Sequence, residues 1–437
     1  MKNIFLSILL ICFAGHIFAY SLYENYELGL GKQVDLLSPR SAGMGGTGTA
    51  AGSELMDKII NPANLGFLQD GLTAQFVFDV TQLEENRSMP MFNFFDSYVA
   101  DATYASNTNF FTDLAIALAY KMRFGDISVA ASLDYKPFIN FNAYYEEQVR
   151  NNEGSDNDNY PPILAMNYLE SEGDIYSYGF TTAFSYHRDY EDWFSKSALG
   201  ININMLNGEH RLERKIIWSE YAKDIAVLND VEDNSGYDYD AVNFSLGLTS
   251  DISRRVSAGL MYAPGFTMNF EDAFSDAEGE ADYPAVLRAG IQFKPRNMLR
   301  TSFHFDLEMV NWSDVSDFYD NVMNYYLGVE HVFPHTVPLR LGFNYVTSPS
   351  SSVDDIPSPI VIPSITAGTG FKIHGDLFLD LSGEFSHRKY ETMDLFPDGY
   401  YDHQGLWSGT YNPQTRTETD TVREYYIQLK SSLTFKW

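Results

Sequence analysis

The stretch SPRSAGMGGTGTAAGSELMDKIINPANLG, residues Ser38–Gly66, decides how the rest of this chain is interpreted. It contains six glycines and few large apolar residues, so it cannot build a hydrophobic core of its own. Glycine lets a backbone turn tightly and approach its neighbours closely, but ordering it costs conformational entropy that the surroundings must offset. The composition therefore predicts a tightly folded backbone inside a space that another part of the chain encloses.

Within this stretch, Gly43, Gly45 and Gly48 also satisfy the G-x-G-x-x-G pattern of dinucleotide-binding loops. That pattern is informative only where it follows a buried strand and begins a helix. The preceding Ser-Pro-Arg-Ser is not a buried strand, the following residues begin a helix poorly, and no lysine follows Gly48. We therefore do not interpret these glycines as a nucleotide site.

The first nineteen residues have the three parts of a secretory signal peptide. Lys2 supplies the charged start, residues 4–18 are predominantly apolar, and Ala19 is a small residue suited to cleavage. Cys12 is the only cysteine, so the sequence predicts a mature protein without disulfides. No later stretch reaches the ~18–20 continuous apolar residues of a membrane helix.

The composition of the exported chain favours an all-β membrane protein. Aromatic residues make up 15%, with 30 Tyr and 32 Phe. A closed barrel is the one non-helical structure that satisfies the backbone inside lipid. The formal net charge of −30 would repel phosphates, so we expect no nucleic-acid partner.

Fourteen runs of the sequence have the length and the alternation of barrel strands. They are 72–81, 113–122, 127–138, 175–187, 197–212, 239–250, 255–270, 284–294, 299–311, 323–333, 338–347, 364–374, 377–389 and 423–437. In 113–122, for example, Leu114, Ile116 and Leu118 share one face, and alanines occupy the other. We expect the apolar face to contact lipid and the other face to line the lumen.

The connections between these runs alternate in length, which is typical of an outer-membrane barrel. The long connections, which follow the odd-numbered runs, are 82–112, 139–174, 213–238, 271–283, 312–322, 348–363 and 390–422. Most of the others are tight, such as 123–126 and 375–376. Long extracellular loops, short periplasmic turns and an even strand number place both termini in the periplasm. The final Phe435-Lys436-Trp437 resembles the strand end that the outer-membrane assembly machinery recognises.

The sequence also resembles a known family. The segments RSAGMGGT (Arg40–Thr47) and NPANLG (Asn61–Gly66) resemble the N-terminal plug of FadL-type outer-membrane transporters of long-chain fatty acids and other hydrophobic compounds. Further resemblance runs through residues 283–349. It implies an all-β, 14-stranded antiparallel transmembrane barrel with the plug, or hatch, inside the lumen. The domains would be a signal peptide (1–19), a plug (20–71) and a barrel (72–437).

The resemblance also implies a mechanism and its residues. Outer loops capture the ligand, a pocket in the barrel holds it, and it leaves by plug rearrangement or through the barrel wall. The plug motif carried over from the family comprises Gly43, Gly45, Gly46, Asn61, Pro62 and Ala63. The candidate capture residues of the first loop are Met89, Met91, Phe92, Phe94 and Phe95. Methionine adapts to ligands of varied shape, although an interface girdle or loop packing would use the same residues.

Strand parity predicts charged pairs across neighbouring strands of the lumen. They are Arg288 with Asp306, Glu330 with Arg340, and Lys372 with Asp380. One interpretation is a structural polar wall that keeps the plug in register. The other is a site for a ligand carboxylate, which Arg288 or Arg340 would hold by two hydrogen bonds.

The sequence leaves two functions open. The first is uptake of long-chain fatty acids or other hydrophobic small molecules. The second is a barrel of the same fold that serves secretion or binds proteins at the cell surface, as an adhesin does. A plug argues against a general porin, and no G-x-S-x-G elbow accompanies His304 and Asp306, so we expect no enzyme. We expect no cofactor or metal, and an outer-membrane location in a diderm bacterium. The expected partners are a hydrophobic ligand, outer-membrane lipid and the assembly machinery.

Overall fold

The computed structural model describes residues 31–437 except 35, 94, 96, 151–161, 189–192, 276, 296–299, 318, 334–336, 354–357 and 397–418. The predicted signal peptide (1–19) and the first part of the predicted plug (20–30) lie outside the described residues.

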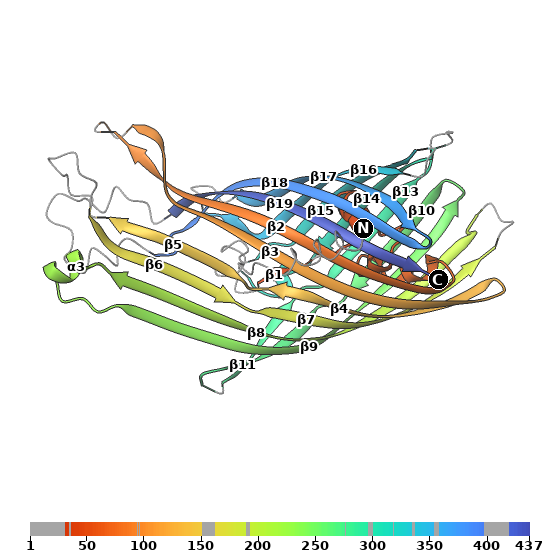
Figure 1. Ribbon diagram of the computed structural model, residues 1–437, viewed down its shortest axis with the longest axis horizontal. Helices are drawn as coiled ribbons and strands as arrows, with labels where there is room; N and C mark the ends of the chain where they lie inside the picture. The colour runs from red at the N-terminus through yellow and green to blue at the C-terminus, as the bar shows by residue number, and fades with distance from the viewer. Residues whose placement is uncertain are drawn as a thin grey trace.

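Fourteen antiparallel strands form a closed barrel (Figure 1), as the alternation predicts. Around the ring they are β2 (Gly71–Phe92), β3 (Tyr98–Phe124), β4 (Ile127–Asn140), β7 (Asp174–His187), β8 (Lys196–Trp218), β9 (Val231–Ser253), β10 (Val256–Ala263), β13 (Val286–Phe293), β14 (Thr301–Val310), β15 (Val322–Val332), β16 (Pro338–Ser352), β17 (Ser358–His374), β18 (Leu377–Met393) and β19 (Thr419–Lys436). Pairing of β19 with β2 closes the ring. At that closure, Trp437 donates its backbone N–H to Leu72 O (2.8 Å).

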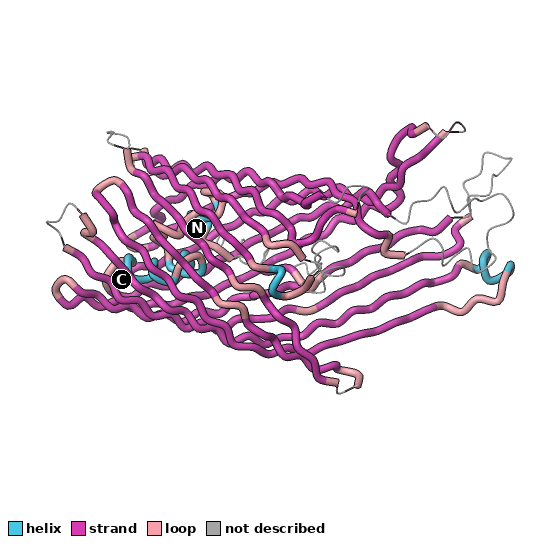
Figure 2. Tube along the Cα trace, turned by 180° about the vertical axis from the view of Figure 1, so that it is seen from behind, coloured by secondary structure: helices cyan, strands magenta, loops and turns pink. Residues whose placement is uncertain are grey.

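Besides this ring, the described residues form five further strands and five short helices. Figure 2 shows helices both among the strands of the ring and beyond the strand ends. The strands are β1 (Lys32–Gln33), β5 (Ala143–Arg150), β6 (Ile163–Glu172), β11 (Phe266–Asp272) and β12 (Glu278–Tyr283). The helices are α2 (Pro39–Ala42), η2 (Leu55–Ile59), η3 (Pro62–Phe67), α3 (Glu220–Ile225) and η4 (Trp312–Asp314). Among the described residues, none of the helices is long and apolar enough to cross a membrane.

The two faces of the wall differ as the alternation predicts. On β3, Leu114 and Leu118 are each 49% exposed on the outer face, whereas Ala115, Ala117 and Ala119 are buried on the inner face. The outer row suits contact with lipid chains. The small inner side chains pack against Leu55 and Met56 of the N-terminal part in one apolar cluster. The sequence therefore supplies large side chains where the solvent is lipid and small ones where another segment must fit.

Several predicted boundaries are wrong; the predicted loop 139–174, for example, contains β5 and β6. The predicted strand 255–270 is broken at Pro264 and Gly265 into β10 and β11, because proline lacks the N–H that a ladder requires. The predicted loop 82–112 is mostly strand, since β2 continues to Phe92 and β3 starts at Tyr98. A 22-residue strand spans roughly 70 Å at ~3.3 Å per residue, far more than the apolar band. Beyond that band the outward-facing side chains are polar, so the alternation of apolar and polar residues no longer identifies the strand.

Candidate functional site

Residues 38–68, which we call the N-terminal segment, begin two of their short helices with matched caps. Ser38 Oγ accepts from Ser41 N at the start of α2 (3.2 Å). Asn61 Oδ1 accepts from Ala63 N at the start of η3 (3.0 Å), with Pro62 at the first helical position. Both choices follow the usual preferences at helix starts. In the Asn-Pro-Ala motif, the side chain of Asn61 thus bonds to the backbone that follows it.

One buried carboxylate organises the fold of the segment. Asp57 accepts hydrogen bonds from Ser38 Oγ (2.5 Å) and Ser41 Oγ (2.7 Å). It also accepts from the backbone N–H groups of Ser53 (2.8 Å) and Glu54 (2.9 Å). These bonds join α2 to the start of η2 and satisfy a charge that burial would otherwise penalise.

The segment contacts strands around the whole ring, from β2 and β4 to β17. Asn61 Nδ2 donates to Thr249 Oγ1 (3.0 Å) and Leu248 O (3.1 Å) on β9. Met56 N donates to Gln75 Oε1 on β2 (2.9 Å). Gly45 N donates to Thr366 Oγ1 on β17 (2.8 Å). Partners on such widely separated strands place the segment within the ring.

Inward-facing glycines of the wall let the backbone of the segment come this close. A Cβ at Gly200 would overlap Pro62, one at Gly247 would overlap Asn61, and one at Gly259 would overlap Thr49. On the opposite side, Gly328 and Gly342 meet Met44 and Gly45 in the same way. Any larger residue at these positions would push the segment away from the wall.

A row of buried ion pairs joins the segment to the wall. Arg40 Nε lies 3.1 Å from Glu330 Oε2, and Arg40 Nη2 lies 2.9 Å from Glu330 Oε1. Glu330 also pairs with Arg340 (2.9 Å), and Arg340 pairs with Asp380 (2.6 Å). The predicted Glu330–Arg340 pair is therefore confirmed. This pair is part of a longer row of ion pairs, to which Arg40 of the segment adds the first member.

Asp306 forms a second junction. Its Oδ2 accepts from Gly48 N (2.9 Å), Thr49 N (3.0 Å) and Thr49 Oγ1 (2.7 Å). Arg288 Nη2 lies 3.2 Å from the same oxygen, which confirms the predicted Arg288–Asp306 pair. Hydrogen bonds to a charged acceptor are the stronger kind, so this carboxylate holds the glycine-rich turn against β14.

The predicted Lys372–Asp380 pair is wrong. The β17–β18 register shifts beside Lys372, so that Gly370 lies opposite Asp380. Lys372 is half exposed and lies 4.0 Å from Asp376. A bulge moves every later side chain by one position, and the hairpin arithmetic assumed an unbroken ladder.

A charged pair that the sequence analysis missed lies on the opposite side of the segment. Lys58 Nζ pairs with Asp134 and donates to Ser132 Oγ (2.9 Å) on β4. Glu54 approaches the closing strands, with its carboxylate 3.7 Å from Lys436 Nζ. Burial raises the pKa of Glu54 to about 7, although Lys436 acts in the opposite direction.

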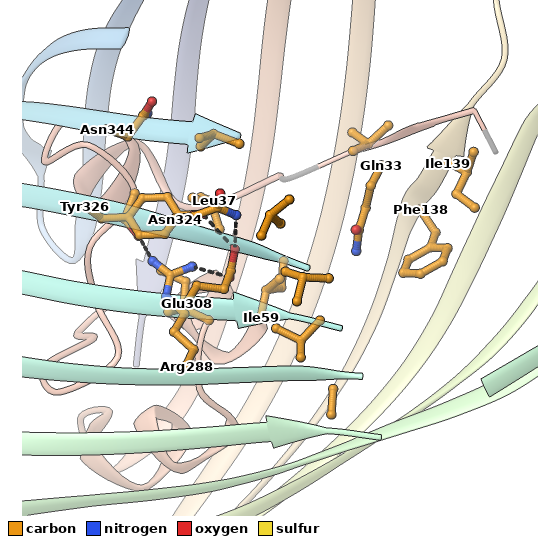
Figure 3. Close-up of a pocket in the computed structure, with 18 of the residues that line it drawn as sticks. Gln33, Leu37, Ile59, Phe138, Ile139, Arg288, Glu308, Asn324, Tyr326 and Asn344 are labelled. Carbon is orange, nitrogen blue, oxygen red and sulfur yellow. Dashed lines mark hydrogen bonds and ion pairs between the residues drawn. The ribbon is translucent and has the colours of Figure 1, made fainter. Parts of the chain in front are cut away.

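The wall and the segment enclose a cavity of about 510 Å³ (Figure 3). Apolar lining comes from Leu37 and Ile59 of the segment and from Phe138 and Ile139 of β4. Polar lining includes Arg288, Glu308, Asn324, Tyr326 and Asn344 on β13 to β16. A volume of this size and mixed lining suits a small apolar ligand with a few fixed polar contacts.

Several of the charged side chains that line the cavity form ion pairs. Arg288 lies 3.3 Å from Glu308 and stacks over Tyr326 at 4.1 Å. Arg388 pairs with Glu424, and Lys430 lies 3.8 Å from Asp79. Arg340 is buried in the row described above and does not line the cavity. Of the two arginines proposed for a ligand carboxylate, the structure brings only Arg288 to the cavity.

The predicted capture residues lie at the hairpin between β2 and β3. Met89 is half buried on β2, and Phe95 is 82% exposed in the turn. Met91 and Phe92 belong to β2, but their side chains lie outside the described part, as does all of Phe94. The described residues contain no cluster of His, Cys, Asp and Glu side chains suited to a metal ion.

Strand number, closure and the apolar outer face define a transmembrane β-barrel of the outer-membrane type. No protein-family model matches the chain, and a search of curated sequences found no match. Similar solved structures are the P. putida toluene transporter TodX (14% identity, TM-score 0.58, 92% of this chain and 98% of that chain) and the Ralstonia pickettii toluene transporter TbuX (16%, 0.55, 92% and 98%). A Pseudomonas aeruginosa FadL homologue is similar too (12%, 0.56, 93% and 99%).

At these identities the likeness shows the fold. The similar structures are FadL-type channels for hydrophobic compounds, as the plug motif predicts. Two of these three structures are toluene transporters, and each of the three matches nearly the whole chain.

Proposed function

We propose that this chain is an outer-membrane channel for the uptake of hydrophobic small molecules, with residues 20–71 acting as its plug. The observation that carries the proposal is the cavity between the N-terminal segment and the barrel wall. Ile59 and Ile60 of the segment face the same space as Val310 and Val322 of the wall. A ligand in that space would have to move the segment, or part the wall, before it could leave.

The plug role is supported by how the segment is held. It is held by non-covalent contacts, among them the ion pairs and hydrogen bonds of Arg40, Thr49 and Asn61, and no disulfide fastens it. Such contacts hold a segment in register yet can be exchanged for others. The motif residues Gly43, Gly45, Gly46, Asn61, Pro62 and Ala63 would then set the resting position of the plug.

We place both termini in the periplasm. Trp437 lies beside Leu72 at the end of the barrel where tight turns at Gly125 and Gly375 join neighbouring strands. The long hairpins and α3 extend from the opposite end (Figure 1). Outer-membrane barrels have their short turns on the periplasmic side.

The cargo that suits this cavity best is uncharged. A fatty-acid carboxylate would need a cation. Of the two arginines that line the cavity, Arg288 already faces Asp306 and Glu308. Arg388 already pairs with Glu424. Displacing a buried carboxylate from its guanidinium costs several kcal/mol. A neutral apolar molecule avoids that exchange. The similarity to toluene transporters supports the same choice.

Capture at the outer end would use Phe95 and Met89, which lie beyond the apolar band of the wall. Extraction of the native purified barrel, followed by mass spectrometry of small molecules, tests the function. We expect a neutral hydrophobic compound at near one copy per barrel. Recovery of a stoichiometric protein partner without any such compound would instead support the secretion or surface-binding alternative.

A further inference from the structure

Four uncharged polar side chains form a group on the wall of the cavity. They are Asn202 and Asn204 of β8 and Asn243 and Ser245 of β9, and all four line the cavity. The β8–β9 ladder pairs Asn202 with Ser245, and Asn204 with Asn243. Paired residues, and every second residue along a strand, have their side chains on the same face of a sheet. The four side chains therefore lie together on the inner face, and we call them the amide patch.

The N-terminal segment leaves the amide patch uncovered. Further along the inner face of β9, Gly247 and Thr249 are buried against Asn61 of the segment. In the other direction along β9, Ala241 is buried in an apolar cluster that also contains Phe138. The side chains of the patch lie between these two covered regions and are only half buried. Their exposed atoms therefore face the cavity.

The hydrogen bonds of the patch run in one direction. Thr181 Oγ1 on β7 donates to Asn202 Oδ1 (2.8 Å), and Asn202 Nδ2 donates to Asn204 Oδ1 (3.1 Å). Asn204 Nδ2 donates in turn to Asn243 Oδ1 (2.7 Å). Within the part of the chain that the structure describes, Nδ2 of Asn243 has no hydrogen-bond partner. An amide nitrogen carries two N–H donors, so the row ends on donors that a molecule in the cavity can reach.

The side chains beside the patch suit an apolar body. Phe266 stacks on Tyr283 with ring centres 5.0 Å apart, and the ring centre of Phe138 lies 6.2 Å from that of Phe266. All three line the cavity. They belong to, or pack against, the apolar cluster of Ala241, which is the next inward-facing residue of β9 after Asn243. Apolar walls beside a few placed polar groups are typical of sites that orient a small ligand by its polar atom.

Charge near the patch favours a neutral polar atom over a carboxylate. Asp134 of β4 lies opposite Gly179 of β7, and Gly179 lies opposite Asn204 in the same cross-strand row. A Cβ at Gly179 would overlap the Asp134 carboxylate, which therefore lies over this glycine. Lys58 of the segment already pairs with Asp134. A neutral oxygen accepts hydrogen bonds from the patch without the cost of taking a further charge out of water.

We propose that the amide patch binds the oxygen atom of a neutral ligand, so that the cavity favours hydrophobic molecules with a carbonyl or ether oxygen over hydrocarbons of the same shape. The inference rests on the proposed function and narrows the class of cargo. Water satisfies the N–H groups of Asn243 when no ligand is bound. A ligand oxygen replaces the bond to water, whereas a hydrocarbon that displaces the water leaves a donor unpaired and loses affinity.

Titration of the purified barrel with two ligands of the same shape tests the proposal. Acetophenone carries a carbonyl oxygen where α-methylstyrene carries a CH₂ group. The substitution Asn243→Leu roughly keeps the volume of the side chain and removes its N–H donors. We expect it to raise the dissociation constant of acetophenone about fivefold, the size expected for one net hydrogen bond, and to leave that of α-methylstyrene unchanged. The matched control Asn207→Leu, at an exposed position of β8 outside the cavity lining, should change neither constant.

Infrared spectroscopy of acetophenone bound to the unmodified barrel gives a test that needs no variant. A hydrogen bond to a carbonyl oxygen lowers its stretching frequency, so the band should lie below that of acetophenone in an apolar solvent. A band at the apolar-solvent frequency would overturn the role of the patch and leave the channel function standing. Equal changes in the two dissociation constants of N243L, or no change in either, would do the same. Failure of the unmodified barrel to bind either ligand would overturn both proposals.

Discussion

Arg40 of the N-terminal segment and Glu330 of β15 form a two-point ion pair across 290 positions of sequence, with N–O distances of 3.1 and 2.9 Å. Both side chains are nearly buried. A buried pair is weak evidence for net stability, but removing one member leaves the other charge uncompensated. The pair therefore fixes where the segment docks and makes its docking sensitive to single substitutions.

Arg40→Gln should weaken the docking of the segment. Glu330 keeps Arg340 as a partner. We therefore expect the free energy of unfolding of the segment to fall by about 3 kcal/mol, the lower end of the range for broken buried pairs. Denaturant titration with a probe on the segment measures this loss. The control Lys223→Ala breaks an exposed pair with Asp230 and should change stability by less than ~1 kcal/mol. Equal effects of the two variants would contradict the assigned role of Arg40.

The inward-facing glycines give a steric prediction. Gly342→Ala places a methyl group against the backbone of Gly45, so the segment should be displaced. Bilayer recordings should then show higher or noisier conductance, because the lumen is less well filled. In Gly383→Ala the new methyl group meets Leu429 at an ordinary 3.5 Å, and conductance should stay as in the parent. Identical recordings from both variants would contradict the explanation that Gly342 leaves room for the backbone of the segment.

Glu54 should make docking depend on pH. Burial raises its pKa to about 7 from an ordinary 4.5, so the folded state holds this proton more tightly than the unfolded chain. The stabilisation that protonated Glu54 gives the folded state is complete below the ordinary pKa and is lost as pH rises through 7. The loss amounts to at most about 3 kcal/mol. Protease sensitivity of the segment should increase between pH 5.5 and 8.5. Glu54→Gln should remove most of that increase, and a pH response that persists in this variant would assign it to another group.

Glu308→Gln tests the argument about cargo charge. It removes one carboxylate partner of Arg288 at the cavity. Binding of a long-chain fatty acid should tighten by about tenfold, which corresponds to ~1.4 kcal/mol. Toluene binding should not change. Ligand titration of the purified barrel measures both, and equal changes for the two ligands would show that the charge of Arg288 does not select between them.

Phe95→Ala tests capture at the outer hairpin. Phe95 is 82% exposed in the turn between β2 and β3, so its loss should not affect folding. We expect slower toluene uptake at low concentration and unchanged uptake at saturation. Deletion of 88–95 is a poorer test, because residues 88–92 belong to β2. Normal uptake by F95A at all concentrations would exclude this side chain from capture.

The sequence predicts the barrel well because each membrane-spanning strand carries its own signal. The alternation of Leu114 and Leu118 with small alanines follows from lipid on one side and a filled lumen on the other. The pairs Arg288–Asp306 and Glu330–Arg340 follow from intact hairpins. The lumen itself is less predictable. Arg40 and Lys58 meet partners far away in sequence, and parity reveals no contact between separate segments.

Irregularities of the ladder escape prediction for the same reason. The bulge beside Lys372 shifts the strand pairing by an amount that the local sequence does not specify. Pro264 explains the break between β10 and β11, but the partner that β11 then takes up on β9 is not visible in the local sequence. The inward-facing position of Gly247 or Gly342 was visible in the alternation, but its meaning required knowing which backbone approaches it. The plug role of residues 20–71 remains a prediction.

Uptake in whole cells tests the central proposal most directly. A diderm host without its own hydrophobic-compound channels would carry either this chain or an empty vector, and the initial rate of radiolabelled toluene uptake would be compared. The account predicts a clear rate above the vector control that is abolished by non-radioactive toluene in excess. An inserted, folded barrel that gives no uptake above the vector control would contradict it.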